Sequence, residues 1–221
     1  VAAAGDITAG GAVAFGAAKS GTLTTAGDVD TTDDNITFTR AVTLTAAVDI
    51  DTVGGSAGNI LFSSTIATAG QNLALDAGTA GNITLSAALT GGGAMTVTDG
   101  AVQAYAALTV GSLSIADATT SVTFNGAIDA STTITVVSGG TIVQTGAVTT
   151  ATTVNYDAGS TIALNANMAV SGDVSITAAA AFSIADNITL TVATGKDIVV
   201  QGTTAALTGG LVATTGDITV T

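Results

Sequence analysis

Apolar residues alternate with small polar residues in short segments along the whole chain. In residues 83–85, Ile-Thr-Leu, the two apolar side chains point to one face of an extended strand and the threonine points to the other. The same alternation begins again at Val122, Ile128 and Ile134. The pattern therefore predicts many short strands, each with one buried face.

These segments recur with a fixed period. Between residues 122 and 188 they begin, in order, at Val122, Ile128, Ile134, Ile142, Val148, Val154, Ile162, Met168, Val174, Phe182 and Ile188. The steps are six, six and eight residues, so each period of 20 residues holds three strands. Toward the N-terminus the pattern continues through Val102, and Gly-rich insertions such as residues 53–58 lengthen some steps. Within residues 1–35 the pattern does not fix the register.

A 20-residue period with three short strands predicts an all-β fold of the right-handed parallel β-helix type. The connections of two to four small residues are too short for a crossover helix, so each strand pairs with its equivalent one coil away. Residues 1–221 then form a single β-solenoid segment of roughly ten coils, a rod of about 50 Å at ~4.8 Å per coil. Inward residues of successive coils stack into apolar columns.

The composition excludes several classes of function. The chain has no Cys, His or Glu, so thiol chemistry and zinc, copper or iron sites are not expected. Its three cations, Lys19, Arg40 and Lys196, stand against 16 Asp, for a net charge of −13, which argues against nucleic acid. No run of about 18 apolar residues occurs, so membrane insertion is not predicted. The scattered cations also leave no basic group beside clustered acids, and the sequence does not predict an enzyme.

Three Asn-Ile-Thr tripeptides, at Asn35, Asn82 and Asn187, match the glycosylation sequon. Related segments carry Asp at the same position, as in Gly5-Asp6 and Gly216-Asp217. A turn accepts both residues because their side chains bond to nearby backbone, whereas a glycan requires Asn. We interpret these residues as the turn that begins a strand.

One acidic cluster is the strongest charged feature. Its members are Asp28, Asp30, Asp33, Asp34, Asp49 and Asp51. In Asp-Val-Asp and Asp-Ile-Asp the two carboxylates point to the same outer face, about 6.6–7 Å apart. Such oxygen ligands could hold Ca²⁺, although neither an EF-hand nor a Gly-Gly-x-Gly-x-Asp array is present. The alternative is a solvated acidic face that supports solubility; no other cofactor is expected.

Two further surface chemistries follow from the Thr and aromatic residues. The outward residues on the second strand of each coil are Thr43, Ala67, Thr90, Thr109, Asp129, Thr149, Ala169 and Thr189, a column too broken for the regular array that ice binding needs. The aromatic residues Phe38, Phe62, Phe124, Phe182, Tyr105 and Tyr156 are expected in the core rather than in a sugar-stacking strip.

Coils that begin Gly-Asn-Ile-Thr-Leu (81–85) or Gly-Asp-Ile-Thr-Val (216–220), rich in Ala and Thr, resemble the filamentous-haemagglutinin-like β-helices of large bacterial surface adhesins and exoproteins. The resemblance implies a secreted or surface-exposed, fibrous bacterial protein. Both ends of the chain keep the repeat pattern, which predicts partners end to end, either neighbouring solenoid segments or identical copies. The expected function is a structural shaft or filament segment. The alternative is a module that binds carbohydrate or a surface, with Ca²⁺ assisting.

Overall fold

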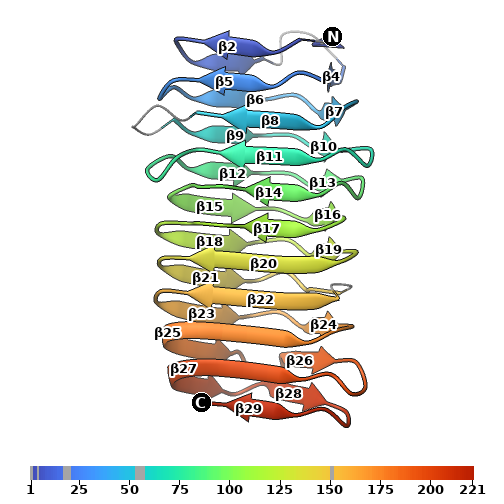
Figure 1. Ribbon diagram of the computed structural model, residues 1–221, viewed down its shortest axis with the longest axis vertical. Helices are drawn as coiled ribbons and strands as arrows, with labels where there is room; N and C mark the ends of the chain where they lie inside the picture. Colours follow the sequence, from blue (N-terminus) through green and yellow to red (C-terminus); the bar gives the residue numbers. More distant parts are fainter. Residues whose placement is uncertain (1, 4, 17–20, 53–57, 150–151) are drawn as a thin grey trace.

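The computed structural model describes residues 2–3, 5–16, 21–52, 58–149 and 152–221. These residues contain strands and turns but no helix, and the strands stack in parallel as a β-solenoid of about 10 turns with about 21 residues per turn. Figure 1 shows the N-terminal coil at one end of the stack and the C-terminal coil at the other. As the chain descends, the nearer strands run leftward and the farther strands rightward, which is the predicted right-handed winding (Figure 1).

The solenoid has three faces, each a ladder of parallel strands. Face A consists of β3 (Val13–Phe15), β6 (Ile36–Phe38), β9 (Ile60–Phe62), β12 (Ile83–Leu85), β15 (Val102–Tyr105), β18 (Ser121–Phe124), β21 (Thr141–Gln144), β23 (Thr161–Leu164) and the second parts of β25 (Val174–Ile184) and β27 (Ile198–Leu207). Face B consists of β1 (Ala2–Ala3), β4 (Leu23–Thr25), β7 (Val42–Leu44), β10 (Ile66–Ala67), β13 (Leu89–Thr90), β16 (Leu108–Val110), β19 (Ile128–Ala130), β24 (Met168–Val170), β26 (Thr189–Val192) and β28 (Gly210–Ala213). Val148 bridges β19 and β24.

Face C completes each coil. It consists of β2 (Ile7–Ala9), β5 (Val29–Thr31), β8 (Val48–Asp51), β11 (Leu73–Asp76), β14 (Met95–Val97), β17 (Leu113–Ile115), β20 (Thr133–Ser138), β22 (Thr153–Ala158), the first parts of β25 and β27, and β29 (Ile218–Val220). In β25 and β27 the strand continues around the corner from face C to face A, with a register shift between Ala178 and Ala181. The pairing also fixes the register of the first coils, where Ile7 pairs with Val29 and Val13 with Ile36.

Two inward positions differ from the prediction. The alternation placed Val102 inside, but Gln103 pairs with Ile83 and Val122 and is fully buried, while Val102 is 41% exposed. Ile188 was the expected partner of Met168; that partner is Leu190. Consequently the outward residue of face B in this coil is Thr191 rather than Thr189. The other columns follow the predicted order, as in Val122, Ile142, Ile162 and Phe182.

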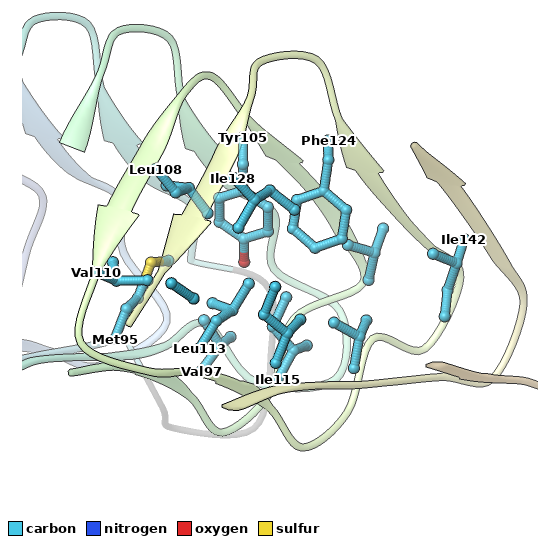
Figure 2. Close-up of a cluster of buried hydrophobic side chains, with 14 of the residues drawn as sticks. Met95, Val97, Tyr105, Leu108, Val110, Leu113, Ile115, Phe124, Ile128 and Ile142 are labelled. Atoms are coloured by element: carbon cyan, nitrogen blue, oxygen red, sulfur yellow. The ribbon is translucent and has the colours of Figure 1, made fainter. Parts of the chain in front are cut away.

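The core is a stack of inward columns that runs through successive coils. Phe38 and Phe62 stack with ring centroids 4.3 Å apart and planes 2° from parallel, as their shared register predicted, and Phe15 extends the stack at 4.6 Å. Farther along, Tyr105 lies 5.7 Å from Phe124 among buried aliphatic residues (Figure 2). All six aromatic residues expected in the core are buried there. This continuous apolar column supplies most of the driving force for folding.

Candidate functional site

The corners of the coil carry ladders of Asn and Asp side chains. Before face A, Asn35 Oδ1 accepts hydrogen bonds from the backbone N–H (2.8 Å) and the side-chain amide (2.9 Å) of Asn59. Asn59 Oδ1 in turn accepts from the N–H of Asn82 at 2.9 Å, and Asn82 Oδ1 from the N–H of Val102 at 3.2 Å. The predicted interpretation as turn residues is thus confirmed for Asn35 and Asn82, with bonds that connect consecutive coils.

An equivalent ladder of carboxylates lies before face C. Asp6 and Asp28 accept the N–H of the residue one coil farther on, at 3.1 and 2.8 Å. Asp173 and Asp197 do the same at the other end, where Asp217 donates the last N–H at 2.8 Å. The third sequon residue, Asn187, instead adopts a left-handed conformation (φ 60°) in a turn that precedes β26.

Face C also aligns carboxylates on its outer surface. Asp30 pairs in register with Asp51, and Asp51 pairs with Asp76. Partial burial, followed by the charges of Asp51, Asp28 and Asp6, raises the pKa of Asp30. Partial burial is also the largest cause of the raised pKa of Asp49, ahead of the neighbouring carboxylates. Burial first, and then the like charges stacked at the coil spacing, shift the pKa of these carboxyl groups toward the neutral form.

The carboxylates that follow one another along face C, here called the acidic column, include Asp30 and Asp51 and extend beyond the six predicted residues to Asp76 and Asp99. Burial and the charges of Asp51 and Asp99 raise the pKa of Asp76, although a hydrogen bond from the Gly78 N–H opposes the shift. Burial and the charge of Asp117 likewise raise the pKa of Asp99, although a hydrogen bond from the Gly100 N–H opposes the shift. The tetrapeptide Leu-Ala-Leu-Asp at 73–76 repeats the pattern of Val-Asp-Ile-Asp at 48–51, and that repetition was the signal in the sequence.

The structure separates the six calcium candidates into two groups. Asp28, Asp30, Asp49 and Asp51 lie on or beside the strands of face C, where the side chains of Asp28 and Asp49 border a shallow hollow. Asp33 (φ 64°) and Asp34 belong to the following corner, and the Asp34 carbonyl accepts a hydrogen bond from Thr31 Oγ1 at 2.6 Å. Among the described residues, no three acidic groups are arranged to hold a metal ion.

The two described basic residues, Arg40 and Lys196, lie apart from this column. Arg40 occupies the corner between faces A and B, where its Nε and Nη2 donate to the Gly21 carbonyl at 3.1 and 2.6 Å. Lys196 lies at the C-terminal end, 3.6 Å from Asp173. Lys19 falls outside the described residues, as does most of the insertion at 53–58. The structure therefore brings neither Arg40 nor Lys196 to the acidic column.

Two polar pairs inside the core were not predicted. Tyr105 donates its hydroxyl to Gln103 Oε1 at 2.7 Å, and Gln103 Nε2 donates to the Asp117 carbonyl at 2.8 Å. Tyr156 makes the same bond to Gln144 at 3.1 Å. Complete burial raises the pKa of both tyrosines. The sequence contained a signal, since the alternation that places Tyr105 inside requires Gln103 to point inward as well.

Comparison with known proteins found no matching family model, curated protein or solved structure. Among the described residues, no helix is long and apolar enough to span a membrane.

Proposed function

We propose that this chain is a shaft segment of a secreted or surface-exposed bacterial fibre, with a mechanical rather than a chemical role. The observation that supports the proposal best is the unbroken sequence of parallel pairings on face C, from β2 in the first coils to β29 in the last. Every described coil contributes to the same core and the same strand ladders. The sequence is therefore used mainly to build a repeated, rod-forming structure.

Three kinds of contact resist separation of the coils. Backbone hydrogen bonds connect each strand to its neighbours, and the inward side chains of consecutive coils touch through the core. The Asn and Asp ladders add a side-chain bond at the corners, where no strand pairing is available. A force along the rod axis must break these contacts coil by coil, whereas a force across the rod loads all three faces together.

The two ends of the segment are compatible with further coils. The tetrapeptide Gly-Asp-Ile-Thr occurs at 5–8 and at 216–219, and both copies lie at the start of a face C strand. At the C-terminal coil Ile218 and Val220 are 44% and 42% exposed, and they continue the apolar columns of face C. We therefore propose end-to-end partners, supplied by another copy or by a neighbouring solenoid segment.

Electron microscopy of the purified chain tests the shaft and its end contacts separately. We expect straight rods of about 50 Å, from roughly ten coils at ~4.8 Å each, and longer rods in multiples of that length. Ile218→Asp should leave only rods of single length, because it places a charge at the end contact. Thr215→Asp, in the preceding corner, is the control. Compact particles without an axis would contradict the shaft, and single rods at every concentration would contradict end-to-end pairing alone.

A surface-binding or carbohydrate-binding module is the second candidate, favoured by the register of Asp30, Asp51 and Asp76 on face C. Titration with CaCl₂ while thermal unfolding is followed discriminates the two roles. A binding module that uses Ca²⁺ predicts a midpoint that rises with Ca²⁺ and an effect that Asp49→Asn removes. A shaft predicts no response beyond that of an equal ionic strength of NaCl.

A further inference from the structure

Face A differs from the rest of the surface in carrying no charge. None of the 16 Asp and none of the described cations lies on its strands, from β3 to the second part of β27. Face C bears Asp30, Asp49, Asp51, Asp76 and Asp157, and face B bears Asp129. Protein surfaces ordinarily intersperse charges of both signs, and a face without them is the part of this acidic rod that a second rod can approach with least repulsion.

The outward residues of face A include larger apolar side chains. Val102 is 41% exposed at the middle of the face, on β15, and it points outward because Gln103 takes the buried position. Leu61 lies two strands before β15 and Val143 two strands after it. Leu61, Thr84, Ala104, Thr123 and Val143 occupy one outward column in strict register.

This arrangement is self-complementary about β15. A two-fold axis along β15 reverses the order of the strands and keeps each residue's position along its strand. It places Val102 opposite Val102 of a second copy, Leu61 opposite Val143, and Thr84 opposite Thr123. Isologous pairing of this kind requires the same patch to match itself, and the register of the column supplies the match.

We propose that two copies of this chain pair in antiparallel orientation through face A, the farther side of the rod in Figure 1. The contact is a sheet-on-sheet packing of two flat ladders. The axis along β15 overlaps nine strands, from β3 to the second part of β25. Nine strands at ~4.8 Å and four residues at ~3.3 Å give about 570 Å² per copy, or about 1,100 Å² in total. That area lies at the lower end for specific pairing, so the dimer is weak and concentration-dependent.

Sedimentation velocity across a concentration series, at 0.05 and 0.5 M NaCl, tests the pairing. We expect a dimer of unchanged rod length that strengthens at high salt, because salt screens the repulsion between two chains of net charge −13. Val102→Asp should raise the dissociation constant by about tenfold or more, since it brings two carboxylates together at the axis. Thr109→Asp, an equally outward substitution on face B, should leave it unchanged.

A charge swap tests the proposed register directly. Leu61→Lys alone and Val143→Asp alone should each weaken the dimer, and the double variant should restore it because each Lys then faces an Asp across the axis. Circular dichroism confirms that each variant is folded. A chain that stays monomeric at high salt and high concentration overturns the proposal, as does a dimer that tolerates Val102→Asp. End-to-end pairing is distinguishable because it lengthens the rod and depends on Ile218 instead.

Discussion

At the scale of single residues, the polar side chains described inside the coil all have hydrogen-bond partners. Gln103 is fully buried, yet its side-chain oxygen and nitrogen both have hydrogen-bond partners. No described buried side-chain oxygen or nitrogen lacks a partner. The Gln103–Tyr105 pair therefore fixes which residues of β15 point inward, and it explains why Val102 is outside.

Tyr105→Phe should destabilise the rod by about 1–3 kcal/mol, because Gln103 Oε1 then stays buried without its donor. Chemical denaturation monitored by circular dichroism measures the change. The double variant Gln103→Leu/Tyr105→Phe removes both partners and should lose less stability than the sum of the two single changes. Strict additivity of the two effects would show that the bond does not couple them.

The direction of each side chain can be tested at Leu164 and Thr123. Leu164 is 1% exposed in the core, and Thr123 points outward from face A. Leu164→Asp should cost several kcal/mol by burying an unpaired charge, whereas Thr123→Asp should change stability by less than about 1 kcal/mol. Thermal unfolding compares the two variants. Equal loss of stability in both would contradict the assignment of faces.

The sequence predicted most side-chain directions, because apolar and polar residues alternate along each strand with the same two-residue period as inward and outward side chains. It was wrong where a local contact outweighs hydropathy. Val102 is more apolar than Gln103, but the buried hydroxyl of Tyr105 needs the Gln as its acceptor. The segment at 186–190 looks like the start of a coil, yet Asn187 forms a left-handed turn that delays the strand to Thr189.

At the scale of elements, the strands are short and the corners decide how coils stack. Successive corners approach so closely that several positions admit only glycine. A Cβ on Gly93 would lie 1.7 Å from the carbonyl oxygen of Gln71, and a Cβ on Gly140 would lie 1.8 Å from that of Thr120. The sequence predicted short connections of small residues between the strands, but only the structure identifies which glycines lie against the previous coil.

Gly93→Ala should therefore destabilise the rod by about 2 kcal/mol or more, because the corner must move away from backbone that cannot yield. Gly10→Ala is the matched control, since nothing lies within 4 Å of its added Cβ and its φ is ordinary. We expect the control to change stability by no more than about 1 kcal/mol. Denaturant midpoints of the two variants give the comparison, and a tolerated Gly93→Ala would mean that the corner is loosely packed.

At the scale of the whole molecule, charge is distributed by register as well as by composition. The sequence placed the acidic cluster on the outward side of its strands. It did not show that Asp30, Asp51 and Asp76 align in consecutive coils, because the insertion at 53–58 lengthens the step between Asp51 and Asp76 and hides the register of β8 with β11. The cost of this alignment must appear as a dependence of stability on pH.

The rod should become more stable as pH falls from 7 toward the unfolded pKa of 3.8. Partial burial and neighbouring carboxylates raise the pKa values of Asp30, Asp49, Asp76 and Asp99 above the unfolded value of 3.8. The folded chain therefore binds more protons than the unfolded chain in this window. Stability falls with rising pH wherever that holds, and the penalty is complete once pH exceeds the folded pKa values.

Asp30→Asn isolates the contribution of the column. The amide keeps the shape of the side chain without its charge, so the variant should be more stable than the parent at pH 7 and should show a shallower pH dependence. Asp157→Asn is the control, because the residues in register with Asp157 in the adjacent coils are Val137 and Thr177, neither of which carries a carboxylate. Urea unfolding at pH 4.5, 5.5 and 7 measures both. A parent chain whose stability does not change through this range would show that the stacked carboxylates are already well screened by water. One that loses stability on acidification would show that carboxyl groups in the folded chain have pKa values below the unfolded value.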